Sequence, residues 1–255
     1  MIRSLLPWLS RPGNLARRAP SWPGVKGRVL YAIGDIHGRH DCLSRALALI
    51  DADLEQQSEP SLEIYLGDFV DRGPSTRDVL ETLMARSKSR DTVLLRGNHE
   101  VLMQEFFDRK LPFDTWRRLG GAETLMSYGI QNFETLHGIV DQATAAVVPP
   151  EHLSLLRGLR NYFVYDRYCF VHAGLRPNIE LHRQSATDLT RIRGDFLNFK
   201  GDFGYTVVHG HTPVSGVDFH SNRINIDTGA YLTSRLSVLR IDETGPEVLG
   251  QVTNG

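Results

Sequence analysis

Apolar and polar positions alternate between two patterns, one typical of strands and one typical of helices, through the first hundred residues. Short runs rich in β-branched and aliphatic side chains predict strands at 28–33, 63–66 and 92–95. The segments between them place apolar residues at helical spacing. One such segment follows a predicted N-cap at Asp41, and the other follows Pro74 in a predicted first turn; their apolar residues are Leu43, Ala46, Leu47, Ile50, Val79, Leu80 and Leu83. Strands alternating with helices predict a parallel sheet.

The pattern changes after residue 100. Residues 100–159 carry apolar positions typical of several helices, and the chain then becomes rich in β-forming residues. Strands at 162–165 and 168–171 are expected to form a hairpin around Asp166-Arg167, and further strands are expected at 205–208, 223–226 and 236–241. We therefore predict one domain over residues 28–250, with a helical insert at about 100–159.

The first 27 residues differ from the rest of the chain. They contain basic residues, no acidic residue and four prolines, which interrupt any helix. Their short apolar piece, 5–9, is too short for a membrane span. We expect a flexible basic tail over 1–27. A docking arm for an acidic partner or a membrane surface, or a transit peptide, is the alternative interpretation.

Composition narrows the classes of function. The chain has 255 residues, of which 41% are hydrophobic, enough for one sizeable core. The net charge of −1 indicates neither a nucleic-acid partner nor an anionic membrane surface. No segment is apolar enough to span a membrane. The two cysteines, Cys42 and Cys169, lie in apolar stretches and are typical of buried thiols, so we expect a cytoplasmic protein.

Potential ligands follow each of the first three predicted strands. The segments are Gly34-Asp-Ile-His-Gly38, Gly67-Asp-Phe-Val-Asp-Arg-Gly73 and Gly97-Asn-His-Glu100. Carboxyl ends of parallel strands meet at one edge of a sheet, and glycine lets a backbone approach a ligand closely. In the second half, His172 and His211 occupy similar positions before Ala-Gly and Thr-Pro. Each residue alone is more typical of a turn or cap, but their convergence predicts a site for divalent ions such as manganese, iron or zinc.

The motifs GDIHG, GDFVDRG, LRGNHE, VHAGL and HGHTP, in this order, resemble those of the phosphoprotein phosphatase family of binuclear metallophosphoesterases. They span residues 34–213. The resemblance implies the calcineurin-like fold, a four-layer α/β/β/α sandwich, and a centre of two divalent metal ions, expected to be manganese, with iron or zinc as alternatives. It assigns Asp35 and His37 to the first metal, Asp68 to the bridge, and Asn98, His172 and His211 to the second metal.

The same resemblance assigns residues that act on the substrate. His99 would protonate the leaving oxygen, and Asp71 would orient His99. Arg72 and Asn98 would contact the phosphate. A second arginine is expected between the two histidine motifs; Arg193 is the chosen match, and Arg191 remains a competitor because an apolar residue is expected at its position. His209 is left out of the ligand set, although wider relatives use both histidines of this motif.

The resemblance implies hydrolysis of a phosphoprotein or a phosphorylated small molecule, by a water that the metals activate. A bacterial-type serine/threonine protein phosphatase is the leading interpretation, from the loop Asn225-Ile-Asp-Thr-Gly-Ala230 and from Asp71. A dinucleoside tetraphosphate hydrolase is the alternative, since such enzymes usually have Ala at the position of Asp71. A catalytically silent phosphate-binding scaffold is a remote alternative, because it predicts lost ligands. No pattern in the sequence sets the oligomeric state.

Overall fold

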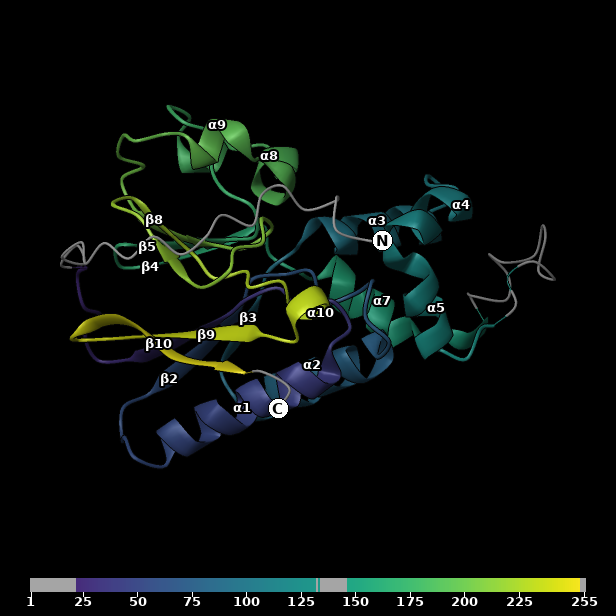
Figure 1. The fold of residues 1–255 in the computed structure, drawn as a ribbon, viewed down its shortest axis with the longest axis horizontal. Helices are drawn as coiled ribbons and strands as arrows, with labels where there is room; N and C mark the ends of the chain where they lie inside the picture. Colours follow the sequence, from purple (N-terminus) through teal and green to yellow (C-terminus); the bar gives the residue numbers. More distant parts are fainter. Residues whose placement is uncertain (1–21, 132, 134–145, 253–255) are drawn as a thin grey trace, which may run out of the picture.

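Two five-stranded sheets form the centre of the protein (Figure 1). The computed structural model describes residues 22–131, 133 and 146–252. The first sheet has the order β10-β9-β1-β2-β3, with strands Gly245–Val252, Leu236–Asp242, Val29–Ile33, Ser61–Tyr65 and Thr92–Leu94. The second has the order β4-β5-β6-β8-β7, with strands Tyr162–Tyr165, Tyr168–Val171, Thr206–His209, Arg223–Asn225 and Asp218–Phe219.

The predicted parallel strands are confirmed, within a first sheet that is mixed because β9 pairs antiparallel with β1 and β10. Strands β1, β2 and β3 pair in parallel, joined by the crossover helices α1 (His40–Leu54) and α2 (Thr76–Ser89). In the second sheet β5, β6 and β8 are also mutually parallel, and the predicted hairpin of β4 and β5 is present. Strand β10 was not among the predicted strands; Pro246 lies in it, and an edge strand is where a sheet tolerates proline.

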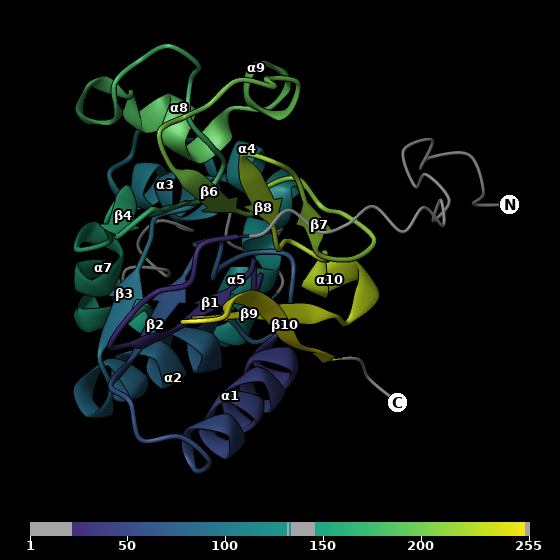
Figure 2. The same ribbon diagram turned by 90° about the vertical axis from the view of Figure 1, so that its left-hand side faces the viewer.

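The predicted four-layer α/β/β/α sandwich is confirmed (Figures 1 and 2). Helices α1 and α2 cover the outer face of the first sheet, and α8 (Ala186–Arg191) and α9 (Gly194–Leu197) cover the second. Strand β1 shows how two cores arise: Tyr31 and Ile33 face the α1/α2 side, while Leu30 and Ala32 pack between the sheets. A third core lies beneath α8 and α9. Side chains alternate across a strand, so one apolar run serves two layers.

Helices also dominate the described part of the segment 100–159. Its elements are α3 (Asn98–Phe107), α4 (Phe113–Trp116), a π-helical turn at Arg117–Gly121, α5 (Ala122–Ser127) and α7 (Pro150–Arg157). They lie at one end of the sandwich, beside the strand ends (Figure 1). Two short elements complete the second half, a 3₁₀ turn at Leu181–Arg183 and α10 (Ala230–Thr233).

Two predicted details of helix α1 and helix α2 are wrong. The N-cap of α1 is Arg39, and Asp41 lies inside the first turn. The Asp41 carboxylate accepts two hydrogen bonds from the Arg39 guanidinium, at 2.7 and 2.8 Å. Helix α2 begins at Thr76, after Pro74 rather than around it. No helix within the described residues is long and apolar enough to cross a membrane.

The folded body begins before residue 28. Val25 is buried between the sheets, and its N–H donates to the Asp242 carbonyl oxygen at 2.7 Å. The Tyr168 hydroxyl donates to the Pro23 carbonyl oxygen at 2.7 Å. Residues 22–27, which the sequence places in the tail, therefore pack against the domain. The rest of the predicted tail, residues 1–21, lies outside the described residues.

Candidate metal centre

Six parallel strands, three from each sheet, deliver a polar residue at their carboxyl ends. Asp35, Asp68 and Asn98 follow β1, β2 and β3; His172 and His211 follow β5 and β6; and Asp227 follows β8. All six side chains are at most 9% exposed. The parallel strands of the two facing sheets thus bring residues nearly 200 positions apart in sequence to one point. Open sheets bind ligands at such strand ends.

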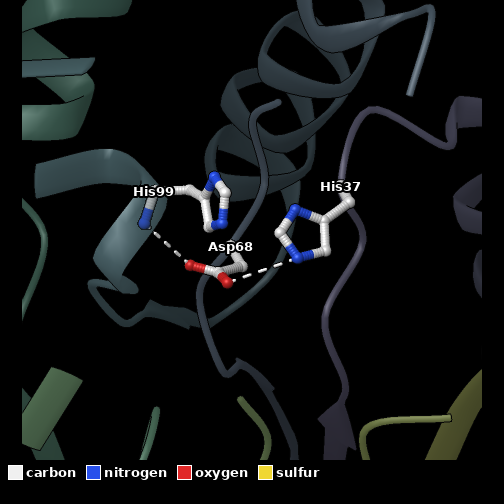
Figure 3. A group of neighbouring side chains, drawn as sticks. All are labelled: His37, Asp68 and His99. Carbon is white, nitrogen blue, oxygen red and sulfur yellow. Dashed lines mark hydrogen bonds and ion pairs between the residues drawn. The ribbon is translucent and has the colours of Figure 1, made fainter. Parts of the chain in front are cut away.

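The Asp68 carboxylate lies at the centre of this group. Its Oδ2 is 3.3 Å from His37 Nε2, and its Oδ1 is 3.4 Å from His172 Nε2. The Oδ1 atom also accepts a hydrogen bond of 3.0 Å from the His99 backbone N–H (Figure 3). The ligand atoms of His37, Asp68 and His99 lie within 4.8 Å of one another, as do those of Asp68, His172 and His211. Asp68 therefore belongs to both groups that could hold a metal ion.

His37 and His172 are held with Nδ1 against a backbone carbonyl oxygen and Nε2 toward the site. The His37 Nδ1 lies 3.0 Å from the Val70 carbonyl oxygen, and the His172 Nδ1 lies 3.0 Å from that of Leu66. A carbonyl oxygen only accepts, so Nδ1 of each ring carries the proton. In both rings Nε2 points at Asp68, so it is the nitrogen left to coordinate a metal ion. This backing of a ligand histidine by a carbonyl is typical of metal sites.

Asn98 and Asp35 add oxygen atoms to the same space. Asn98 Oδ1 is 3.1 Å from His172 Nε2. The Asp35 Oδ2 accepts the His211 backbone N–H at 3.0 Å, whereas its buried Oδ1 has no hydrogen-bond partner among the described residues. A buried oxygen without a partner is costly, and a cation would satisfy it. Gly210 makes room for it, because a Cβ there would lie 2.1 Å from Asp35 Oδ1.

The buried carboxylates of the centre need positive charge nearby. Burial, followed by the nearby Asp227, raises the pKa of Asp35 well above its usual range, and burial also raises the pKa of Asp227. Burial would raise the pKa of Asp68 too, but the imidazoles of His172, His99 and His37 hold it well below normal. Four buried carboxylates, those of Asp35, Asp68, Glu100 and Asp227, thus share one region. Bound divalent cations would supply the missing charge.

The pKa values of His172 and His211 shift in opposite directions. Burial lowers the pKa of His172, yet Asp68 and Asp35 overcome burial and raise it to about 10. A cation bound at Nε2 would replace that proton. Burial, and then His172, lower the pKa of His211 to about 2, so its imidazole is neutral and able to coordinate. The donor set therefore fits a centre of two divalent metals with mixed oxygen and nitrogen ligands.

Glu100 supports the centre without entering it. Its carboxylate accepts four backbone N–H groups, from Asp68, Phe69, Val70 and Gly97, at 2.7 to 3.3 Å. It is fully buried, and burial, then Asp68, raise its pKa to about 7. The side chain thus joins the turn after β2 to the turn after β3. Because Asp68 and Asn98 stand on these two turns, Glu100 sets the distance between them.

His99 is held by a carboxylate instead of a carbonyl. Its Nδ1 lies 2.8 Å from Asp71 Oδ2, and both side chains are buried. The same Oδ2 accepts the Trp116 indole N–H at 3.0 Å, and Asp71 Oδ1 accepts the Thr124 hydroxyl at 2.8 Å. A carboxylate partner stabilises a protonated imidazole, which can donate a proton and cannot bind a metal. The ring meets that of His37 edge to face, with centroids 4.7 Å apart (Figure 3).

The backbone of the site is unusual. Nine described non-glycine residues have positive φ, and five of them are predicted site residues: His37, Asp68, Asp71, Arg72 and His211, with φ between 48° and 71°. This left-handed conformation costs roughly 1–3 kcal/mol for each such residue and persists only where the surroundings impose it. Here the hydrogen bonds to Glu100, Thr124 and Asp35 impose it. The backbone strain thus lowers the folding stability while it orients these side chains toward the site.

Two arginines flank the centre. The Arg72 guanidinium lies 4.4 Å from the centroid of the Tyr231 ring, and Tyr231 in turn meets His37 edge to face at 5.1 Å. Arg193 donates to the His211 carbonyl oxygen at 3.4 Å, and its charge contributes to the lowered pKa of His211. Arg191, on the last turn of α8, is exposed and has no such contact among the described residues. Of these two arginines, only Arg193 contacts a candidate ligand residue within the described part of the chain.

His209 stands outside the ligand groups. Its Nδ1 is 3.1 Å from the Gly210 carbonyl oxygen, its Nε2 lies 3.4 Å from the Arg223 guanidinium, and its ring packs on Phe196. Burial and Arg223 lower its pKa to about 3. The neutral imidazole is therefore a packed core residue.

Sequence patterns did not single out Glu100, Trp116, Thr124 or Asp227. For Asp227 a signal exists, because it follows strand β8 as Asp35 follows β1. Glu100 ends the motif Gly-Asn-His-Glu, so its position was conspicuous although its role was not. Trp116 and Thr124 carry no local signal, because they reach Asp71 from 45 and 53 residues away.

The sequence of the chain is similar to a protein family and to several known proteins. The family model described as "Calcineurin-like phosphoesterase" matches residues 29–235. The bis(5'-nucleosyl)-tetraphosphatase PrpE [asymmetrical] of Anoxybacillus flavithermus is 24% identical over 233 residues, covering 83% of this chain and 89% of that protein. The protein of the same name from Halalkalibacterium halodurans is also 24% identical, with the same coverage.

Solved structures show the same fold. A putative diadenosine tetraphosphatase has a TM-score of 0.62 at 20% identity, covering 91% of this chain and 97% of that one. A protein serine/threonine phosphatase from Saccharomyces cerevisiae has a TM-score of 0.50 at 13% identity, covering 93% of this chain and 85% of that one. At these identities the likeness concerns the fold alone.

Proposed function

The chain belongs to the calcineurin-like phosphoesterase family, a family of binuclear metallophosphoesterases, and from this premise we propose that it hydrolyses bis(5'-nucleosyl) tetraphosphates. It is a phosphoric ester hydrolase. The observation that carries the choice of substrate is its similarity, over 83% of its length, to proteins named bis(5'-nucleosyl)-tetraphosphatase. This departs from the interpretation that the sequence alone favours, a serine/threonine protein phosphatase.

The proposed metal ligands are the six that the motifs predict. Asp35 and His37 would hold one ion, Asn98, His172 and His211 the other, and Asp68 both. Support comes from the partnerless Asp35 Oδ1, from the two Nε2 atoms that point at Asp68, and from the position of Asp68 in both candidate groups. When bound, two such cations neutralise the phosphate oxygens and activate water for attack on phosphorus.

The remaining residues act on the substrate. The Arg72 and Arg193 guanidinium groups and the Asn98 side chain would contact phosphate oxygens from different sides of the centre. As the bond from phosphorus to the leaving oxygen breaks, His99 would donate its proton to that oxygen. Asp71 keeps the imidazole oriented, and the Trp116 and Thr124 donors keep the Asp71 carboxylate in place.

One observation favours a second candidate, the serine/threonine protein phosphatase. The intact His99–Asp71 pair suits a poor leaving group such as a serine or threonine alkoxide, which needs a proton as it departs. A nucleotide leaves as a stable anion and needs that proton less. Hydrolysis of phosphopeptides at a lower efficiency is compatible with the same site.

Steady-state kinetics on one metal-loaded preparation test the proposal. We expect kcat/KM for bis(5'-adenosyl) tetraphosphate to exceed that for phosphoserine and phosphothreonine peptides by about tenfold or more, equal to about 1.4 kcal/mol of transition-state stabilisation. A preference of that size for the phosphopeptides would overturn the proposed substrate and return the protein phosphatase to first place. An aryl phosphate serves as the reference that both classes share.

A further inference from the structure

A recess opens beside the metal centre, on the side of Arg72 and Tyr231. It has a volume of about 490 Å³, and its walls are the start of α1, the turn that follows β2 and the first turn of α10. Arg39, His40, Arg72, Ser75 and Tyr231 line it. Sites for small molecules and cofactors span roughly 300–1,000 Å³. The recess is therefore large enough for the body of a small ligand, and much larger than a single phosphate needs.

Two lining residues connect the recess to the proposed metal ligands. The Tyr231 ring meets the His37 ring with centroids 5.1 Å apart, and the Arg72 guanidinium lies over the Tyr231 ring. A substrate whose reacting phosphate lies at the metal ligands would reach the recess by passing Arg72 and Tyr231.

Arg72 is fixed in position but keeps its donors available. Its backbone has a φ of 71°, and its N–H donates to the Gly120 carbonyl oxygen at 3.1 Å. Gly120 must be glycine for this contact, since a Cβ there would lie 2.6 Å from Arg72 N. Within the described residues, no carboxylate lies in ion-pair range of the Arg72 guanidinium and no acceptor takes its N–H groups. A guanidinium in this state binds phosphate oxygens well.

The outer end of the recess has a different character. The Arg39 guanidinium is occupied by the Asp41 carboxylate, the Ala230 carbonyl oxygen and the Ser234 hydroxyl. His40 Nε2 lies 2.9 Å from the Thr82 hydroxyl. The wall therefore offers one available cation at its inner end and a polar, nearly neutral surface beyond. A chain of inorganic phosphates would need cations along its length, whereas a nucleotide carries its charge at one end.

We propose that this recess is the subsite for a nucleoside 5'-phosphate joined to the reacting phosphate. Arg72 contacts the phosphate next to the reacting one, and the sugar and base occupy the space toward His40 and Ser75. The inference rests on the proposed function, which supplies a substrate with a nucleotide beyond the reacting phosphate. It adds which face of the centre receives that nucleotide.

Filling the recess tests the proposal, with ADP as the probe. Ser75 precedes α2, its side chain makes no cap, and its backbone N–H donates to the Gly38 carbonyl oxygen, a bond that substitution preserves. Isothermal titration calorimetry on metal-loaded protein should show ADP binding at least about tenfold weaker in Ser75→Phe, with a smaller loss in Ser75→Leu. The Kd of inorganic phosphate should stay within about twofold. Inhibition of aryl phosphate hydrolysis by ADP should weaken in parallel.

Ser154→Phe is the matched control. Ser154 lines a recess of about 510 Å³ between α2, β3 and α7, away from the metal centre, and filling it should leave ADP binding unchanged. Unchanged ADP affinity in both Ser75 variants, with normal thermal unfolding, would overturn the proposal. So would equal losses for ADP and inorganic phosphate, since they would place the disturbance at the metal centre. None of these measurements uses a dinucleotide, so a wild-type preference for phosphopeptides would refute the proposed function alone.

Discussion

Two kinds of histidine surround Asp68. His37 and His172 approach it from different sheets, and each ring has a backbone carbonyl oxygen 3.0 Å behind its Nδ1. His99 approaches from α3, and behind its Nδ1 stands the Asp71 carboxylate at 2.8 Å. A carbonyl oxygen fixes the proton on Nδ1 and leaves Nε2 facing the site to coordinate a cation, whereas a carboxylate is a suitable partner for an imidazolium. In the proposed assignment, the group behind the ring separates a metal ligand from a proton donor within one cluster.

The supports of the two sides differ as well. The metal-facing side rests on strand ends and on Glu100, which ties two of those ends together. The proton-donating side rests on the helical segment after α3, through Trp116 and Thr124. Damage to the first side should therefore show in metal content, and damage to the second in the dependence of the rate on the leaving group. The predictions below test this separation.

Removing the shared carboxylate should have the largest effect. We expect Asp68→Ala to lose both metals and about 10⁴-fold or more in activity, equal to about 5.5 kcal/mol of barrier. Elemental analysis of the purified protein measures the metal content. Asp114→Ala, at an exposed carboxylate, should keep its metals. Two metals per chain in Asp68→Ala would show that Asp68 is not the bridge.

His99→Asn should retain metal and lose about 10²–10⁴ in kcat on alkyl phosphate esters, because no proton reaches the leaving oxygen. The loss should be smaller on an aryl phosphate or a dinucleoside tetraphosphate, whose leaving groups are better. Asp71→Asn should follow the same pattern. Loss of metal in His99→Asn would instead make His99 a ligand, as its proximity to His37 and Asp68 allows, and the distinction between the two histidine types would fail.

Glu100→Gln tests the metal-facing support. An amide can accept from some of the four backbone N–H groups, but its own N–H₂ faces donors. We expect metal affinity to fall about 10–100-fold, the usual cost of losing a group that orients ligands. Activity should recover at saturating manganese. Unchanged affinity in a metal titration would mean that the two turns hold their positions without this carboxylate.

Trp116→Phe tests the support on the other side. It removes one buried donor to Asp71 and keeps the aromatic contact with Phe106, whose ring stacks on Trp116 at 4.7 Å. The lost hydrogen bond should cost about 1–3 kcal/mol of folding stability. We expect kcat on alkyl phosphates to drop about tenfold, with a smaller drop on an aryl phosphate and unchanged metal content. Phe106→Leu, which disturbs packing but spares the indole N–H, should leave the ratio of the alkyl and aryl phosphate rates unchanged.

The smallest effects are expected at the two exposed arginines beside the centre, Arg193 and Arg191. Arg193→Ala should raise KM about three- to tenfold, at most about 1.4 kcal/mol, with kcat nearly unchanged, because an exposed arginine contributes little when water competes. Arg191→Ala should have less effect than this. If Arg191→Ala has the larger effect, the arginines exchange roles, and the comparison of the two sides is untouched.

The sequence by itself determined which residues reach the centre. A side chain that directly follows a strand is placed by that strand, so the motifs after β1, β2, β3, β5 and β6 were visible as local patterns. The parallel order of the strands follows from the alternation with helices. The edge strand β10 escaped prediction, because an edge position tolerates the glycine and proline that mark turns elsewhere.

Only the tertiary structure decided what each residue is equipped to do. The partner of His172 lies 106 residues away at Leu66, those of Asp71 lie 45 and 53 residues away, and Asp35 meets His211 across 176 residues. Such hydrogen bonds arise when layers pack, and no local pattern encodes them. A histidine in a motif has the same composition whether a carbonyl or a carboxylate stands behind it. Packing selects that neighbour, and the neighbour selects the chemistry.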